Sequence, residues 1–423
     1  MITLQTIRNR KEYVLERLLV KNFKAKEIVD RIIELDERRR STQQQSDNLS
    51  AEQNQISKEI GQLFAQGKKD EAEGKKSQSV KLKEDGKTFA DQLSQIENEI
   101  NGLLVLLPNL PGEQVPAGNS PEDNVVTRQS GKMPVLIDDA KPHWELAAKF
   151  DIIDFELGNK ITGAGFPVYK GKGAKLQRAL ISFFLDNAIA AGFTEYQPPI
   201  LVNAETGFAT GQLPDKDSQM YFVNEDGFYL IPTAEVPVTN IYRNRILKED
   251  DLPVKMTAYT PCFRREAGSY GKDVRGLNRL HQFDKVEIVR IEHPDNSYKV
   301  LDEMVSYVEG LVQKLELPYR ILKLCGGDMS FASALTYDFE VFSGAQKKWL
   351  EVSSVSNFET FQSNRMKLRF KDKNGKMQLC HTLNGSALAL PRIVASLLEN
   401  NQTENSILIP EALRAYTGFD KID

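Results

Sequence analysis

The sequence predicts an α+β protein. An N-terminal antiparallel coiled coil of two long helices should precede a domain built on a mainly antiparallel β-sheet flanked by helices. Two observations carry this prediction. Residues 27–103 have apolar residues three and four positions apart, with a single polar interruption. Beyond residue 130, short alternating runs occur in pairs between amphipathic stretches, which is typical of antiparallel strands with covering helices.

A third observation separates the two parts. A proline- and glycine-rich stretch begins at Pro108, and such residues end a helical pattern. At 423 residues the chain is long enough for two domains. We place the first domain at residues 1–108 and the second at 131–423, joined by an irregular linker at 109–130.

The repeat in residues 27–103 predicts a helical hairpin that closes its own apolar seam. Residues 1–24 should form a short helical lead-in, and the polar, glycine-containing segment 66–70 should form the turn. At about 1.5 Å per residue, helices of about 40 residues give an arm of roughly 60 Å. The middle of the arm should be its less well packed part, because its seam positions include Arg39, Thr42, Ser46 and Gln53.

The arm also carries clusters of basic residues that suit phosphate groups. They are Arg38, Arg39, Arg40, Lys68, Lys69, Lys75 and Lys76. Acidic residues nearly balance them along the arm, so any basic patch is local. A coiled coil more commonly serves dimerisation or spacing, and the pattern alone leaves both interpretations open.

Composition narrows the possible functions. The net charge of −4 gives no sign of nucleic-acid binding by bulk electrostatics. The three cysteines and four histidines form no CxxC or HxxxH pattern, which argues against a disulfide framework and against zinc, and for a reducing compartment. The start of the chain lacks the pattern of a signal peptide, and no apolar run approaches the length of a membrane span. We therefore expect a soluble, cytoplasmic protein without a membrane partner.

The most informative stretch is a predicted hairpin near the middle of the chain. Thr257–Phe263 and Gln282–Val289 should be its strands, joined by a mobile, basic, glycine-containing loop. Arg264 and Glu266 should share one face at the end of the first strand, with Phe283 on the second. A guanidinium, a carboxylate and an aromatic ring suit the phosphate, exocyclic amine and base of a nucleotide. A lone Arg-x-Glu pair would more simply be a surface salt bridge.

The motif Phe-Arg-x-Glu, followed by a loop rich in glycine and arginine and then by Arg-x-x-Gln-Phe, closely resembles the second signature motif of class II aminoacyl-tRNA synthetases. Residues 174–202, a helix and a proline-containing strand, resemble the first motif. The stretch from Gln378 to Asn400, with a helix starting near Gly385 and carrying Arg392, resembles the third. The likeness to the seryl-tRNA synthetases covers nearly the whole chain.

This resemblance implies a bacterial-type serine–tRNA ligase. L-Serine and ATP would form seryl-adenylate and pyrophosphate, and serine would then pass to the 3′ end of tRNA(Ser). The resemblance further implies that the arm binds the tRNA, that the first motif builds a homodimer, and that Mg²⁺ accompanies ATP. It leaves open whether tRNA(Sec) is also charged.

By register, the resemblance assigns Arg264 and Arg392 as catalytic residues that neutralise charge on the α-phosphate. The implied ATP-binding set is Arg264, Arg265, Glu266, Arg279, Phe283, Glu351, Val352, Ser353, Ser354 and Arg392. Glu351 and Ser354 are the implied Mg²⁺ ligands, and their oxygens suit that ion. The implied serine-binding set is Thr233, Ala234, Glu235, Arg264, Glu287, Asn384 and Ser386.

Two other classes of protein fit parts of the sequence. A catalytically silent synthetase paralogue would only bind tRNA, and retention of Arg264, Glu266, Glu351 and Arg392 argues against it. A coiled-coil scaffold protein would leave the whole chain beyond residue 130 unexplained. Measuring serine-dependent exchange of pyrophosphate into ATP separates these classes.

Overall fold

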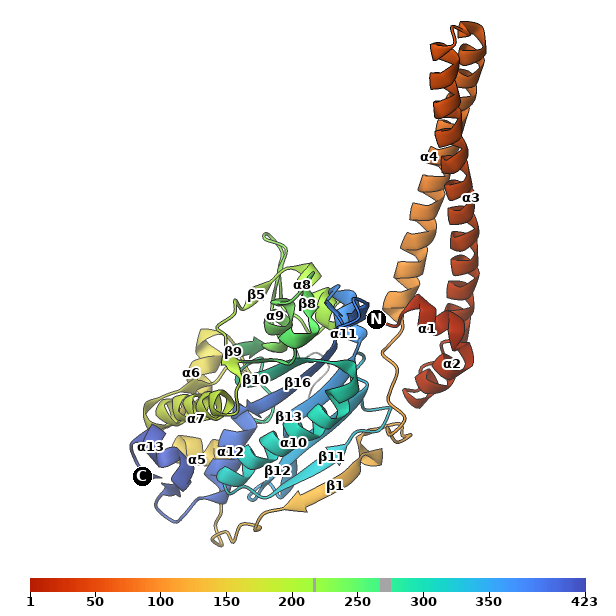
Figure 1. Ribbon diagram of the computed structural model, residues 1–423. Helices are drawn as coiled ribbons and strands as arrows, with labels where there is room; N and C mark the ends of the chain where they lie inside the picture. Colours follow the sequence, from red (N-terminus) through yellow and green to blue (C-terminus); the bar gives the residue numbers. More distant parts are fainter. Residues whose placement is uncertain (216–217, 267–274) are drawn as a thin grey trace. The chain divides into compact units, whose positions relative to one another are not determined.

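The computed structural model is shown in Figure 1 and describes residues 1–215, 218–266 and 275–423. The chain divides into two compact units. One comprises residues 1–19 and 23–108, and the other comprises residues 20–22 and 109–423. Among the helices in the described part of the chain, none combines the length and the apolar composition needed to cross a membrane.

The first unit is a helical hairpin. Its elements are α1 (Leu4–Asn9), α2 (Lys11–Val20), α3 (Lys26–Ala65) and α4 (Lys69–Leu106). Between the long helices, Gly67 has a left-handed φ of +74°, which glycine adopts without a steric penalty. The predicted pair of long helices and the predicted turn between them are confirmed.

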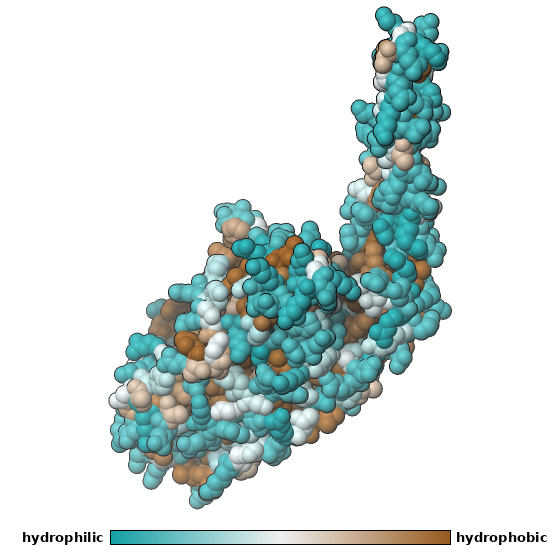
Figure 2. All heavy atoms as spheres, in the orientation of Figure 1, coloured by the Kyte–Doolittle hydropathy of each residue, from teal (hydrophilic) through white to brown (hydrophobic). Residues whose placement is uncertain are grey.

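Packing along the hairpin is uneven, as its seam residues predict. Its buried residues are Val29, Ile32, Leu35, Asp36 and Ile56 of α3, and Ala72, Ile96, Ile100 and Leu104 of α4. No residue between Asp36 and Ile56, a stretch that is fully described, is buried. The visible surface of both helices is mostly hydrophilic (Figure 2). Cross-helix ion pairs such as Arg31–Glu99 at 2.7 Å are exposed and therefore add little stability.

The second unit is organised by an eight-stranded sheet with the order β1-β11-β12-β13-β16-β10-β9-β4. Its strands are β1 (Val125–Ser130), β4 (Thr194–Glu195), β9 (Val254–Phe263), β10 (Gln282–Glu292), β11 (Tyr319–Lys323), β12 (Leu335–Ser343), β13 (Lys348–Glu359) and β16 (His381–Ala389). Neighbouring strands are antiparallel, except that β4 runs parallel to β9. The predicted fold class is confirmed.

One face of this sheet packs against α7 (Gly171–Ala190), α10 (Ser297–Lys314) and α12 (Leu390–Asn400), as Figure 1 shows. Val286 and Ile288 of β10 join the apolar core on this side. Because side chains alternate along a strand, Lys285 and Glu287 point to the other face. That face carries the candidate site.

Short elements complete the second unit. The helices are α5 (His143–Lys149), α6 (Phe155–Ile161), α8 (Ala204–Thr210), α9 (Glu235–Asn240), α11 (Phe361–Arg365) and α13 (Glu411–Thr417). The strands are β2 (Ile153–Asp154), β3 (Val168–Tyr169), β5 (Leu201–Val202), β6 (Phe222–Val223), β7 (Phe228–Leu230), β8 (Ile246–Lys248), β14 (Arg369–Lys371), β15 (Met377–Leu379), β17 (Ile407–Leu408) and β18 (Lys421–Ile422).

Part of the segment predicted to be an irregular linker is structured. The Asn109 side-chain amide donates hydrogen bonds to the carbonyls of Ala332 and Phe358, at 2.9 and 2.8 Å. Residues 125–130 form β1, the edge strand that pairs with β11. Every residue of β1 is exposed, so this strand has none of the apolar alternation by which strands are recognised in a sequence.

The helix predicted to start near Gly385 begins later, at Leu390. Residues 385–389 instead belong to β16, where Gly385, Ser386 and Ala389 pair with β10 and Gly385 also pairs with β13. Pro391 lies in the first turn of α12, a position where its missing N–H group costs no hydrogen bond.

The first strand of the central hairpin also ends earlier than predicted. β9 stops at Phe263, so Arg264 and Glu266 lie beyond it and do not share a strand face. Glu266 has a φ of +49°, which breaks the extended alternation that the prediction assumed. The predicted mobile, basic loop includes residues 267–274, which lie outside the described residues.

We expect the second unit to fold without the arm. Excising residues 27–103 and joining the ends by a short glycine–serine connector removes no part of the second unit or of its apolar core. Near-UV circular dichroism and the midpoint of thermal unfolding should stay close to those of the same unit in the full chain. Leu180→Ala, which opens a cavity in that core, should lower the midpoint in both chains. Loss of the near-UV signal on excision alone would contradict this expectation.

Candidate active site

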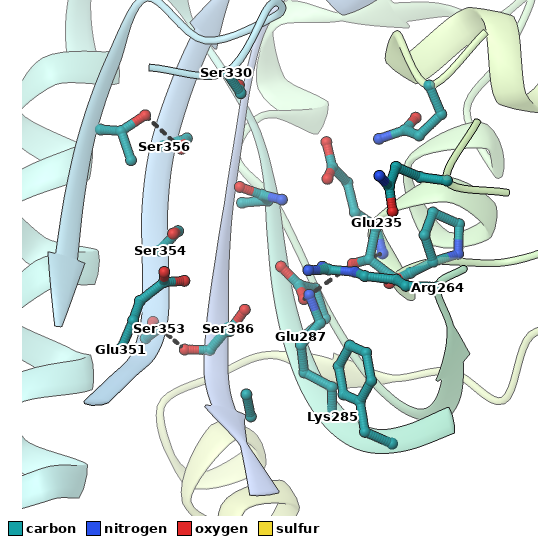
Figure 3. Close-up of a pocket in the computed structure, with 18 of the residues that line it drawn as sticks. Glu235, Arg264, Lys285, Glu287, Ser330, Glu351, Ser353, Ser354, Ser356 and Ser386 are labelled. Atoms are coloured by element: carbon teal, nitrogen blue, oxygen red, sulfur yellow. Dashed lines mark hydrogen bonds and ion pairs between the residues drawn. The ribbon is translucent and has the colours of Figure 1, made fainter. Parts of the chain in front are cut away.

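A cavity of about 810 Å³ lies against the sheet face that carries Lys285 and Glu287. Figure 3 shows side chains from β10, β13 and β16 turned toward this space, together with Arg264 and Glu235. Every residue predicted to bind ATP or serine lines the cavity, except Ala234 and Arg265.

The register of the antiparallel strands brings these residues together. On β10 and β16, Glu287 lies opposite Ser386 and Val289 lies opposite Asn384. On the other side of β16, Asn384 lies opposite Ser356 of β13. The polar groups of the site are therefore cross-strand neighbours, although they are far apart in the sequence.

Two predicted residues lie elsewhere. Ala234 is fully buried in an apolar cluster with Val238 and Met256, so its methyl group packs against α9 and β9 rather than lining the cavity. Arg265 is exposed, and its guanidinium lies 5.8 Å from the ring centroid of Tyr221. Its side chain lies outside the cavity, whereas the side chains of Arg264 and Glu266, which also follow the end of β9, line it.

The two predicted catalytic arginines stand at the cavity wall. Arg264 donates from Nε to the carbonyl of Pro232 at 3.3 Å, and its guanidinium lies 5.2 Å from the ring centroid of Phe283. Arg392 donates from Nε to the Asn278 carbonyl at 2.9 Å and from Nη1 to the Glu351 carbonyl at 2.8 Å. Backbone oxygens thus fix the position of both cations before any anion binds.

The rim of the cavity holds an ion pair between Arg279 and Glu266. The resemblance assigns both residues to the ATP-binding set, but in this structure they are engaged with each other. A nucleotide would have to separate the pair, and since it is partly exposed, its separation costs little.

The deepest polar group is Glu287, which is 1% exposed. Its Oε2 accepts a hydrogen bond from Thr233 Oγ1 at 3.2 Å and lies 2.5 Å from Lys285 Nζ. Its Oε1 is buried and has no hydrogen-bond partner among the described residues. A buried carboxylate oxygen without a donor is costly, so this atom indicates a place where a ligand donates.

Glu235 is a second buried carboxyl group in the same wall, 6% exposed. Burial raises its pKa to about 7, and repulsion from Glu287 acts in the same direction. A hydrogen bond from Gln362 and the charges of Lys285 and Arg264 partly offset this rise. Glu235 therefore changes its charge near neutral pH.

The predicted Mg²⁺ ligands face the cavity from β13. The Glu351 side chain is 50% exposed, and Ser354 Oγ donates to Asp338 Oδ1 at 2.6 Å. Burial and the nearby Glu351 carboxylate raise the pKa of Asp338 well above its ordinary value. A donor set made only of oxygens suits a hard divalent cation, and two carboxyl groups that repel each other gain from one.

Sequence reasoning missed three residues of this site. Lys285 was visible as the strand neighbour between Phe283 and Glu287, but lysine in a strand usually faces solvent. Asp338 alternates with Thr336 and faces Ser354 across the β12–β13 pair. Gln362 reaches Glu235 from α11, 127 positions away along the chain, so no local pattern reveals this contact.

The basic residues predicted to bind tRNA lie on the two long helices, and ion pairs engage most of them. Arg39 and Arg40 pair with Asp36 at 2.9 and 3.3 Å. Lys68, Lys75 and Lys76 pair with nearby glutamates at 3.8, 2.7 and 2.9 Å. Arg38 and Lys69 are exposed and form no ion pair with the described residues, so they are the candidates with the most charge available to a phosphate.

The raised pKa of Glu235 predicts a pH-dependent gain in stability from Glu235→Gln. The folded-state pKa of about 7 exceeds the ordinary value of 4.5, so ionisation favours the unfolded state. The loss of folding stability caused by ionisation of Glu235 is absent below pH 4.5, grows between pH 4.5 and 7, and reaches its full size above pH 7. Glu235→Gln should therefore stabilise the chain at pH 8 by on the order of 3 kcal/mol and leave it nearly unchanged at pH 4.

Denaturant unfolding at both pH values measures this difference. Glu225→Gln, in the exposed turn between β6 and β7, is the matched control and should show no such dependence. Equal effects of Glu235→Gln at pH 4 and pH 8 would rule out the raised pKa.

Comparison with known proteins supports what the geometry suggests. A family model described as the seryl-tRNA synthetase N-terminal domain matches residues 1–111. A second, described as the tRNA synthetase class II core domain (G, H, P, S and T), matches residues 221–401. The first match covers the predicted helical hairpin, and the second covers the segments that resemble the second and third class II motifs, whereas residues 174–202, which resemble the first motif, lie outside both.

Whole-chain likenesses agree. The serine–tRNA ligase of Salinibacter ruber is 50% identical over 100% of this chain and 99% of its own length. That of Methylacidiphilum infernorum is 47% identical over 98% and 99%. The crystal structure of seryl-tRNA synthetase from Pyrococcus horikoshii complexed with ATP has a TM-score of 0.92 at 33% identity, covering 100% of this chain and 99% of that one. The chain therefore belongs to the seryl-tRNA synthetase family of class II aminoacyl-tRNA synthetases.

Proposed function

We propose that this chain is a serine–tRNA ligase that activates L-serine with ATP and transfers it to the 3′ end of tRNA(Ser). The observation that carries the proposal is the polarity of the cavity. Its inner wall holds the buried carboxyl groups of Glu235 and Glu287, and its outer wall holds Arg264 and Arg392. An amino acid presents an ammonium group to the first wall and a carboxylate to the second, where the phosphates of ATP also bind.

In the first step, a serine carboxylate oxygen attacks the α-phosphorus of ATP. A new oxygen–phosphorus bond forms, the bond to the bridging oxygen breaks, and pyrophosphate leaves with the electron pair. Arg264 and Arg392 neutralise the charge that develops on the α-phosphate, and their backbone contacts hold them in place for it. No nucleophile from the protein is required.

Adenine would lie against the ring of Phe283, and Glu266 would accept from its exocyclic amine once Arg279 turns to phosphate. Mg²⁺ bound through Glu351 and Ser354 would supply further neutralisation of phosphate charge. The backbone or side chains of the segment 351–354 and of Arg265 complete the proposed ATP site.

The part of the cavity that binds serine must recognise the hydroxyl group of the serine side chain. Glu287 Oε1 is a buried acceptor that no described residue reaches with a hydrogen bond, and Thr233, Asn384 and Ser386 also line the cavity. A site built to hydrogen-bond a hydroxyl group rejects alanine, because its own polar groups would be left unpaired. The backbone of Ala234 is the remaining proposed contact.

In the second step, a ribose hydroxyl at the 3′ end of the tRNA attacks the seryl carbonyl, and AMP leaves. We assign tRNA binding to the helical arm within residues 1–108 and catalysis to residues 131–423. The likeness of residues 174–202 to the first class II motif supports a homodimer, and the three buried free cysteines suit action in the cytoplasm.

Serine-dependent exchange of labelled pyrophosphate into ATP tests the first step directly. Arg264→Ala should lower the exchange rate by about 10²–10³-fold, because no neighbouring donor replaces its guanidinium on the α-phosphate. Arg245→Ala removes an exposed arginine outside the cavity and is the matched control. An unaltered chain without exchange would indicate a silent paralogue, and an Arg264→Ala variant with most of its rate would remove this residue from the site.

The ion pairs on the arm predict which basic residues matter for tRNA. The double variant Arg38→Ala/Lys69→Ala should weaken tRNA binding, and it should flatten the dependence of affinity on salt by about one unit of slope for each phosphate that the arm no longer neutralises. Lys75→Ala/Lys76→Ala removes the same formal charge from residues that are already paired and should have the smaller effect. Pyrophosphate exchange should be unchanged in both. Equal losses of tRNA affinity would show that the ion pairs do not determine the interface.

A further inference from the structure

Gln362 is a buried amide whose hydrogen bonds converge on the candidate serine pocket. It lies on α11 and is 1% exposed. Its Nε2 donates to Glu235 Oε1 at 2.6 Å and to the carbonyl of Thr210 at 3.2 Å. Its Oε1 accepts from Thr382 Oγ1 at 2.7 Å. These three contacts join α11 to the walls formed by α8, α9 and β16.

The orientation of this amide is fixed by chemistry. A backbone carbonyl can only accept, so the atom of Gln362 that faces Thr210 must be the NH₂ group. The second hydrogen of that group then points to Glu235 Oε1. Oε1 is consequently held as an acceptor, whichever protonation state Glu235 adopts.

The other oxygen of Glu235 is in a different position. Oε2 makes no hydrogen bond within the described residues, and Glu235 lines the cavity, toward which Figure 3 shows its side chain pointing. Because Oε1 is occupied, a proton taken up by Glu235 must reside on Oε2. Protonation thus converts the cavity-facing atom from an acceptor into a donor.

We propose that Gln362 is a positioning residue that reserves Oε2 of Glu235 for a hydrogen-bond donor of the amino-acid substrate and makes this contact dependent on pH. The proposal rests on the proposed function. It adds to that function the atom that accepts a hydrogen bond from the substrate, Glu235 Oε2, and the residue that holds this atom in place, Gln362. An ammonium group can only donate, so it matches the ionised form of Glu235 and not the protonated form.

The charges that face Glu235 are Glu287, Lys285 and Arg264. Arg365, which shares α11 with Gln362, donates instead to the carbonyls of Phe208 and Leu213, at 3.1 and 3.2 Å. The hydrogen bond from Gln362 lowers the pKa of Glu235 against burial and against Glu287. Removing that hydrogen bond should raise this pKa further. A larger fraction of the enzyme would then have Glu235 protonated at neutral pH, the form that an ammonium group does not match.

The test compares Gln362→Met with the unaltered full-length chain in serine-dependent pyrophosphate exchange between pH 5.5 and 9. The variant should raise the KM for serine about tenfold at pH 7.5 and leave the KM for ATP within about twofold. In a plot of kcat/KM for serine against pH, the fall at low pH reflects the pKa values of groups in the free enzyme. In the variant, this acidic limb should move to higher pH. An unmoved limb, or an equal rise in both KM values, would overturn the proposal.

A double-mutant cycle separates positioning from a general loss of structure. In a Glu235→Gln background, Gln362→Met should change the KM for serine by less than about twofold, since the group it acts through is gone. If Gln362→Met does not fold, Thr382→Val takes its place. This variant removes the donor to Gln362 Oε1 and should shift the limb in the same direction by a smaller amount.

Binding gives a readout that does not require catalysis. Isothermal titration of serine should show affinity falling below pH 7 for the unaltered chain, and falling at a higher pH for Gln362→Met. Affinity that is independent of pH in both chains would overturn the role of Gln362 even where exchange is normal. An unaltered chain that binds serine but shows no exchange would contradict the proposed function and leave this inference supported.

Discussion

The candidate site depends on the pairing of β10 with a strand on each of its edges. Glu287 lies opposite Ala258 of β9 on one side and Ser386 of β16 on the other. A shift of one residue would exchange the two faces of β10. Val286 would then face the cavity, and Glu287 would face the apolar layer under the helices, where an unpaired charge is very costly. The apolar core thus fixes the register, and the register fixes the polar groups of the site.

Some polar and charged groups of the cavity have no full partner within the described part of the chain. These groups are complementary to the proposed substrates. Lys285 is paired with Glu287 at 2.5 Å, while the amide of Gln362, a neutral group, is the hydrogen-bond donor to Glu235. Among the described residues no donor reaches Glu287 Oε1, and an ammonium group would supply one. At the outer wall Arg264 and Arg392 donate to backbone carbonyls, and Arg392 Nη1 also lies 3.9 Å from Glu351 Oε2. A bound anion would neutralise the positive charge that these contacts leave.

The sequence predicts those features that depend on neighbours along the chain. The heptad pattern, the two strands of the central hairpin and the Arg264 and Phe283 pair are of this kind. The role of Gln362 is not, because its contact with Glu235 requires α9 and α11 to meet across the fold. The ion pairs of the arm show the same difference between local and long-range contacts. Lys76–Glu73 is visible as an i,i+3 pair, whereas Lys75–Glu59 depends on the register of one long helix against the other.

Burial gives the two units different electrostatic properties. Lys285 and Glu287 are 5% and 1% exposed, so water and salt screen their interaction weakly. On the arm, Lys68 and Glu71 expose 52% and 62% of their side chains, and exposed charges are screened over a distance of about 8–10 Å at physiological salt. In the proposed function, activation of serine would rely on charges of the first kind, and tRNA binding by the arm would rely on charges of the second. If the arm binds tRNA as proposed, ionic strength should act mainly on the transfer step, because the arm would exchange exposed ion pairs for contacts with phosphate while the cavity would keep its own ion pairs.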